Sequence, residues 1–140
     1  MDPLAFLHRT AKKLKNANHE ADQRTAASRS YYAIYHHIKN AFEREGIHLK
    51  TSHGLLYNYF FQPSLPHDIQ AIGKHLQTLY EYRRRADYDL SDPWQKEDSS
   101  IAYSMANKLN TTFSIAFTGD TKRSIVEAVK TYLDSRGYIN

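Results

Sequence analysis

The sequence contains no cysteine, so no disulfide bond and no thiolate ligand for zinc or an iron–sulfur cluster can form. No apolar run approaches the length of a membrane span, and the N-terminal segment turns basic too early for a signal peptide. No repeat, low-complexity tract or Pro/Gly-rich linker divides the chain. We therefore expect a single domain over residues 1–140, located in the cytoplasm and making no contact with a membrane.

The motifs of several common enzyme classes are also missing. The sequence has no glycine-rich phosphate loop, His-Glu-x-x-His pair, nucleophile-elbow serine or calcium loop. The adjacent residues His36 and His37 would point from different sides of a helix, which makes them a poor metal-ligand pair. We expect neither a metal ion nor a cofactor.

Helix start and stop signals recur along the chain. Asp2 and Pro3 form a cap followed by a first-turn proline, while Gly46 and Gly137 each provide a left-handed stop. Apolar residues repeat every three or four positions between such signals, and no segment shows strand-like alternation with hairpin signals. The first helix is predicted to run to about residue 15, and helices follow over about residues 20–45 and 51–61. A fourth helix starts at about residue 66, a fifth includes residues 102–116, and the last lies between residues 120 and 137. The predicted fold is an all-α bundle of five or six helices.

The same periodicity predicts which residues face the core. The apolar stripes that it defines are Ala27, Tyr31, Ile34, Ile38 and Ala41; Ile69, Ile72, Leu76 and Leu79; Ala102, Met105, Leu109, Phe113 and Ala116; and Ile125, Val129, Tyr132 and Leu133.

Charge and aromatic content permit an anionic partner. Nineteen Lys and Arg against fifteen Asp and Glu give a formal charge of +4. Eleven tyrosines outnumber six phenylalanines, and rings with a polar tip suit stacking or a protein interface. These features permit an anionic partner or a protein interface without requiring either.

The stretch YEYRRRADYDL contains three consecutive arginines, and helical spacing separates them. Continuing the apolar stripe of this helix leads to Arg83, and Asp87 is the nearest carboxylate on that face. Arg84 and Arg85 rotate away and are expected to be free to meet solvent or phosphate. Arg83 and Asp87 are either an ordinary partly buried ion pair or a preorganised arginine at a cleft, with Tyr88 beside it.

A second polar stripe lies on the long helix over residues 20–45. Arg29, Tyr32 and His36 are spaced three and four residues apart, so they share one face. His53 is predicted in the first turn of a short helix, where free backbone N–H groups favour an anion. Each histidine is alternatively a hydrogen-bonded or packed structural residue.

Three segments of the sequence resemble, in this order, the motifs of the HEPN family. They are AASRSYYAIYHHIKNAF, LKTSHG and LYEYRRRADYDL. The resemblance covers about residues 26–90 and is closest to the small stand-alone branch, with one departure, Ser52, inserted before His53. It implies an α-helical bundle that usually dimerises and takes part in RNA cleavage, RNA binding or nucleotide binding. Many such proteins are encoded beside a minimal nucleotidyltransferase in toxin–antitoxin and defence modules.

The resemblance implies candidate site residues and also shows a departure. RNA-cleaving members share an Arg followed, after four to six residues, by a His late in the bundle, and no His follows Arg83 here. Arg29 and His36 have that spacing but lie earlier. Three hypotheses remain: an endoribonuclease using Arg29, His36 and Arg83; a silent binding partner of a nucleotidyltransferase; and a helical scaffold. The ligand-binding residues are then Tyr32, His53, Arg84, Asp87 and Tyr88.

Overall fold

The computed structural model describes residues 1–50 and 52–137, except for the side chains of residues 52–55. Its elements are η1 (Phe6–Ala11), α1 (Lys12–Leu14), α2 (Glu20–Arg44), η2 (Ser52–Phe60), α3 (His67–Tyr88), α4 (Lys96–Ala116) and α5 (Gly119–Ser135). No strand occurs among the described residues. The predicted all-α fold is confirmed.

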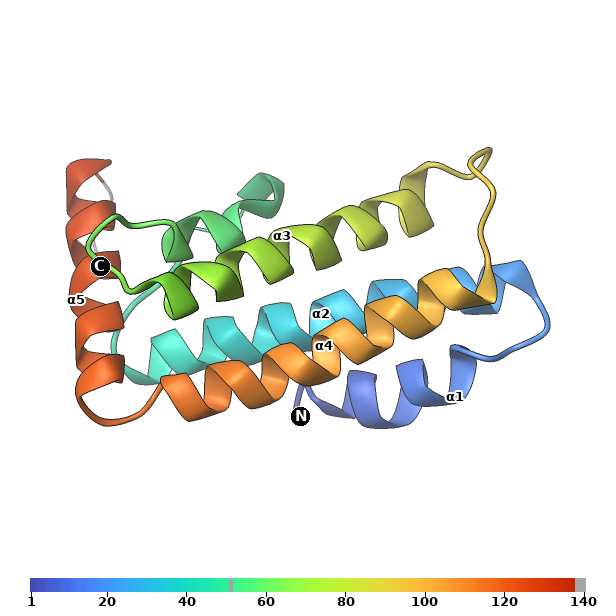
Figure 1. Ribbon diagram of the computed structural model, residues 1–140, viewed down its shortest axis with the longest axis horizontal. Helices are drawn as coiled ribbons and strands as arrows, with labels where there is room; N and C mark the ends of the chain where they lie inside the picture. The colour runs from blue at the N-terminus through green and yellow to red at the C-terminus, as the bar shows by residue number, and fades with distance from the viewer. Residues whose placement is uncertain (51, 138–140) are drawn as a thin grey trace.

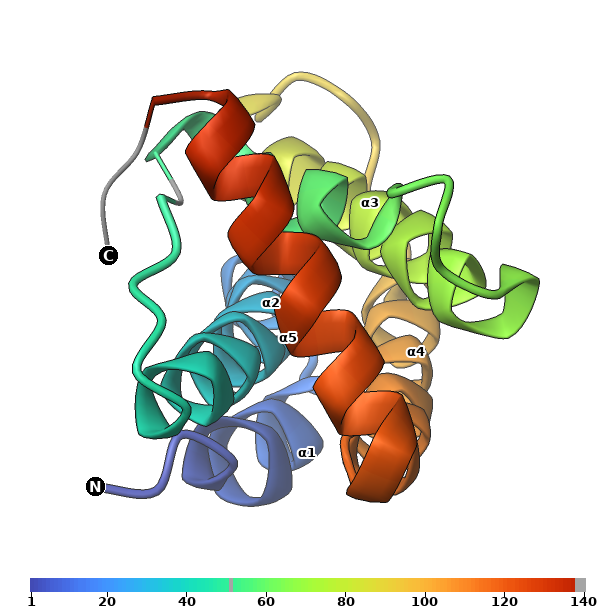
Figure 2. The same ribbon diagram turned by 90° about the vertical axis from the view of Figure 1, so that its left-hand side faces the viewer.

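Three long helices, α2, α3 and α4, run side by side along the length of the molecule (Figure 1). The continuous η1–α1 segment packs against α2 on the outside of this three-helix bundle, and η2 packs on α3. Helix α5 crosses one end of the long helices at a steep angle, as Figure 2 shows. Because α2 contacts η1, α3 and α4, it forms the centre of the bundle.

The apolar stripe of α2 is buried as predicted, with Tyr31, Ile34 and Ile38 each no more than 2% exposed. The helix ends at Arg44, one residue before the predicted end. Gly46 adopts a φ of 79°, which a residue without a Cβ reaches without strain. The N–H of Ile47 then donates to the carbonyl of Phe42, and that of Gly46 to Glu43, at 3.0 Å each. This pattern closes the helix as a Schellman motif.

The other stripes are also buried, with small exceptions. All four stripe residues of α3 are buried, as are Ala102, Leu109 and Phe113 of α4 and Ile125, Val129 and Leu133 of α5. Met105, Ala116 and Tyr132 are only partly buried and pack at the edge of the core.

The first helix starts later than predicted. Asp2 acts as a cap, since its Oδ1 accepts the N–H of Leu4 at 3.0 Å. The next N–H groups bond three residues back, Ala5 to Asp2 and Phe6 to Pro3, and form a tight turn. Regular helical structure therefore begins at Phe6 with η1 and continues through α1.

Among the described residues, no helix is both long and apolar enough to cross a membrane.

Candidate functional site

Arg83 and Asp87 form the ion pair that the stripe of α3 predicted. Arg83 Nε lies 3.0 Å from Asp87 Oδ2, and the two side chains are 15% and 29% exposed. The contact is ionic, because the Nε–H is not aligned for a hydrogen bond. The buried hydroxyl of Ser28, on α2, donates to the same Oδ2 at 3.1 Å. Asp87 is thereby held between two helices, and the pair is partly buried.

The ring of Tyr32 brings the two candidate arginines together. Arg83 Nη2 donates a hydrogen bond to the Tyr32 hydroxyl, and Arg83 Cζ lies 5.0 Å from the centre of that ring. Arg29 Cζ lies 5.3 Å from the same centre. Two guanidinium groups on one half-buried ring concentrate positive charge, which an anion would neutralise.

Arg29 differs from Arg83 in its partners. Its guanidinium lies over Phe6 at 5.6 Å and over Tyr32, and no carboxylate among the described residues pairs with it. Its N–H groups remain available for a ligand, whereas those of Arg83 are partly occupied by the protein.

His36 extends the same face by one helical turn. Its ring stacks against Tyr32 with 6.1 Å between centres, and it meets Tyr35 edge-on at 4.9 Å. Burial lowers the pKa of His36, and the nearby charges of Lys39 and Arg29 lower it further. The imidazole is therefore mainly neutral at pH 7, which is the form that accepts a proton.

Tyr88 completes the group at the end of α3. It is 67% exposed, its hydroxyl lies 3.5 Å from Arg83 Nη2, and Arg83 Cζ lies 5.3 Å from its ring centre. Burial alone would lower the pKa of Arg83, but Tyr32, Asp87 and Tyr88 together raise it. Arg83 thus remains a permanent cation. Together these residues form an arginine–tyrosine cluster, which consists of Arg29, Tyr32, His36, Arg83, Asp87 and Tyr88.

The remaining predicted residues lie outside this cluster or outside the described residues. Arg84 is exposed and pairs with Glu81 at 3.9 Å, so it faces solvent as predicted. Arg85 was wrongly predicted to be free, because its Nε lies 2.9 Å from Asp92 and its Nη2 3.7 Å from Asp98. The side chain of His53 lies outside the described part of the chain.

Arg24 was not predicted to have a structural role, yet this arginine residue is only 6% exposed. Its Nη1 and Nη2 donate to the carbonyls of four residues at and beyond the end of α3, namely Arg85, Ala86, Asp89 and Asp92. Its Cζ also lies 5.3 Å from the ring of Trp94. Arg24 therefore caps the helix end beside the cluster. Extending the apolar stripe of α2 back by three residues from Ala27 reaches Arg24. The helical periodicity therefore indicates that Arg24 faces the core, although it does not indicate which groups Arg24 binds.

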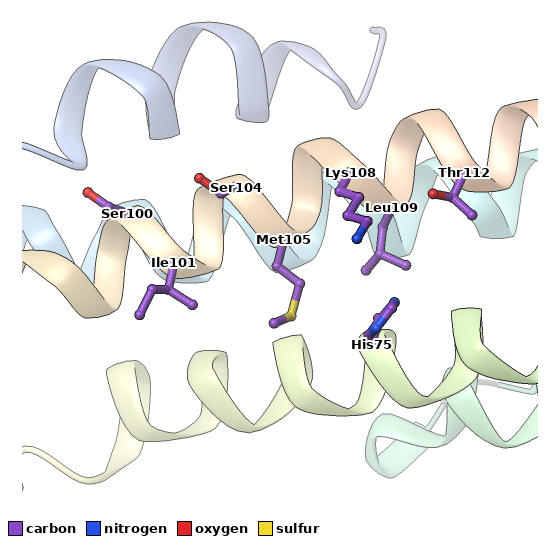
Figure 3. A pocket seen from close by; sticks show the side chains of 8 residues that line it. All are labelled: His75, Ser100, Ile101, Ser104, Met105, Lys108, Leu109 and Thr112. Atoms are coloured by element: carbon purple, nitrogen blue, oxygen red, sulfur yellow. The ribbon is translucent and has the colours of Figure 1, made fainter.

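A separate groove of about 430 Å³ lies between α3 and α4. Met105 and Leu109 point into it from α4, and His75 approaches from α3, with Lys108 at its edge (Figure 3). None of the cluster residues lines it.

Within the described residues, no group of three or more His, Asp or Glu could hold a metal ion.

Comparison with known proteins gives one match. The family model for the HEPN domain matches residues 7–115, which run from the second residue of η1 to the last but one of α4 and include every residue of the cluster. No curated protein and no solved structure matches the chain. The match extends over most of the sequence, and the helical fold agrees with it. The chain therefore belongs to the HEPN domain family.

Proposed function

We propose that this protein binds the phosphate groups of RNA or of a nucleotide at the arginine–tyrosine cluster. Membership of the HEPN family indicates an RNA-related or nucleotide-handling role. The observation that supports the cluster as the site is the convergence of Arg29 and Arg83 on the single ring of Tyr32. Guanidinium groups recognise phosphate oxygens with paired N–H donors, and tyrosine rings stack on bases.

The roles of the two arginines follow from their partners. Arg83 is oriented by Asp87 and Tyr32, so it presents a fixed cation at low entropic cost. Arg29 has no carboxylate partner among the described residues and is free to form new bonds with a ligand. Tyr88 is exposed beside them and offers a face for a base.

A titration of ATP and of a short single-stranded RNA tests the proposal. Arg29→Ala and Arg83→Ala should each weaken binding of both ligands by about tenfold or more, since each removes a charged group that holds phosphate. Arg123→Ala is the matched control, because Arg123 is exposed on α5 and pairs with Asp120. Unchanged affinity in both cluster variants would leave the helical-scaffold hypothesis in place.

The second candidate function is metal-independent cleavage of RNA. The lowered pKa of His36, beside the cation Arg29, favours it. A neutral imidazole can take the proton of a ribose 2′-hydroxyl as that oxygen attacks the adjacent phosphorus. The bond from phosphorus to the 5′-oxygen then breaks, the leaving oxygen takes a proton from water, and a 2′,3′-cyclic phosphate forms. Arg29 and Arg83 can stabilise charge on the crowded phosphate during this step. The late Arg-to-His motif of RNA-cleaving family members is absent from α4, which contains neither residue type.

Incubation with total RNA in EDTA separates cleavage from silent binding. An endoribonuclease should leave 2′,3′-cyclic phosphate ends, and His36→Ala should abolish them while still binding RNA. Binding without such ends would favour the alternative of a silent subunit that presents RNA or a nucleotide to a nucleotidyltransferase partner. Either activity suits a toxin–antitoxin or defence module, which we propose as the biological setting.

We also propose that the protein acts as a homodimer. The exposed face of α2 and the end of α3 present several half-buried or exposed tyrosines, including Tyr32, Tyr35 and Tyr88. Such rings are common in interfaces with an apolar centre and a wet rim. Sedimentation at micromolar concentration should show a dimer, and a monomer alone under these conditions would rule the proposal out.

A further inference from the structure

One short segment contains the whole net charge of the chain. Residues 3–19 include four basic residues, Arg9, Lys12, Lys13 and Lys15, and no acidic residue. The formal charge of the complete chain is +4, so the remaining residues have equal numbers of acidic and basic side chains. The distribution of charge is strongly uneven, which is typical of a protein with a localised polyanion-binding surface.

The structure exposes this charge on the outer side of η1–α1. Leu7 and Ala11 are fully buried and attach the segment to the bundle, whereas Arg9, Lys12 and Lys13 are exposed. None of these three cations forms an ion pair with a described residue. Lys15 lies at the other edge of the segment, over the ring of Tyr103. The exposed cations are therefore not neutralised within the described part of the chain.

The basic segment adjoins the arginine–tyrosine cluster. Phe6, the first residue of η1, lies 5.6 Å from Arg29 Cζ, and η1 packs along α2 (Figure 2). Arg9 and Lys13, four residues apart, project from one side of the segment. Lys13 lies seven residues beyond Phe6, about 10 Å further along the helix axis. One phosphate bound at Arg29 cannot reach it, but a chain of nucleotides can.

We propose that Arg9 and Lys13 bind backbone phosphates of a single-stranded RNA whose chain continues from the arginine–tyrosine cluster. The inference rests on the proposed phosphate binding at that cluster and specifies its ligand as a polymer instead of a mononucleotide. A single strand suits the site because the exposed ring of Tyr88 can stack on an unpaired base. A membrane surface fits less well, since the apolar side of η1 is already buried and cannot enter lipid.

The experiment compares three probes on the full chain: ATP, a short oligouridylate, and vesicles containing phosphatidylserine. The test variant is Arg9→Ala combined with Lys13→Ala. The control is Lys74→Ala combined with Lys130→Ala, which removes two exposed charges from α3 and α5. Oligouridylate affinity is measured over a range of salt concentrations, and Arg29→Ala is measured in parallel with all three probes.

The test variant should bind oligouridylate about tenfold more weakly at low salt while its affinity for ATP is unchanged. Its salt dependence should become shallower by about 0.7 in log–log slope for each phosphate that the variant no longer neutralises. The control should match the wild type. The inference is overturned if both double variants lose affinity equally, if neither does, or if only vesicle binding depends on Arg9 and Lys13. Failure of Arg29→Ala to weaken ATP or oligouridylate would instead contradict the proposed cluster function.

Discussion

At the scale of single residues, Asp87 shows how a carboxylate can orient an arginine and still leave some of its N–H groups to bind a ligand. It accepts from Ser28 on α2 and pairs with Arg83 on its own helix. Asp87→Ala should lower the free energy of unfolding by about 1–2 kcal/mol, because the pair is neither fully buried nor exposed. It should also weaken phosphate binding, since Arg83 loses its orientation.

Urea unfolding and ligand titration measure these two effects separately. Asp87→Asn is the control, because it keeps the size of the side chain and an acceptor for Ser28 while removing the charge. A variant Asp87→Ala that binds ligand as tightly as the wild type would show that Arg83 needs no positioning by this carboxylate.

His36 makes a prediction about pH. Its pKa in the folded protein is below the usual value, so the unfolded chain binds the proton more readily. Stability from this group is therefore present above about pH 6.5 and decreases as the pH falls through that value. Urea midpoints of the wild type should fall on mild acidification more than those of His36→Gln. His37, whose pKa is lowered by its own burial, contributes in the same direction and remains in both proteins. Equal pH dependence in the two proteins would contradict the account.

At the scale of elements, Arg24 closes the end of α3 from a neighbouring helix. Arg24→Met keeps the apolar stem beside Trp94 but leaves the carbonyls at the end of α3 without their donor. We expect a loss of roughly 2–4 kcal/mol in the free energy of unfolding, and faster amide exchange around residues 85–92. Arg123→Met on α5 should change stability by less than about 0.5 kcal/mol, as surface substitutions usually do. Unchanged exchange at the end of α3 would show that the cap is dispensable.

The packing of η2 on α3 depends on Gly73. A Cβ at this position would lie 2.8 Å from Phe60 Cβ and 2.8 Å from Phe61 Cε1. Gly73→Ala should therefore destabilise the protein by about 1–3 kcal/mol through overpacking, despite the better helix propensity of Ala. Gly46→Ala is an informative comparison, because that site has open space but a φ of 79°. Thermal unfolding measures both, and a more stable Gly73→Ala would mean that η2 can move away from α3.

At the scale of the whole molecule, the sequence predicted what lies within one helix and missed what lies between chain segments. Periodicity located the stripes and the pair of Arg83 and Asp87, because those residues are neighbours one turn apart. It did not predict that Ser28 bonds to Asp87, nor that Arg24 caps α3, since their partners lie about sixty residues away. The acceptors of Arg24 are main-chain carbonyls, which every residue has, so the residue types do not show which of them accept its hydrogen bonds. The prediction that Arg85 is free was wrong for the same reason, because Arg85 pairs with Asp92 in the following loop and with Asp98 in the following helix.

Trp94 gives the molecule an internal optical reporter. It is the chain's single tryptophan and is 6% exposed, and its Nε1 donates to Ser99 Oγ at 2.8 Å, which in turn donates to the carbonyl of Gln23. The ring also contacts Arg24 and Arg85, so its surroundings include α2, the end of α3 and the start of α4. Its emission, free of contributions from any second indole, therefore reports when these three helices separate. The junction beside the arginine–tyrosine cluster can thus be followed by fluorescence in the unlabelled protein.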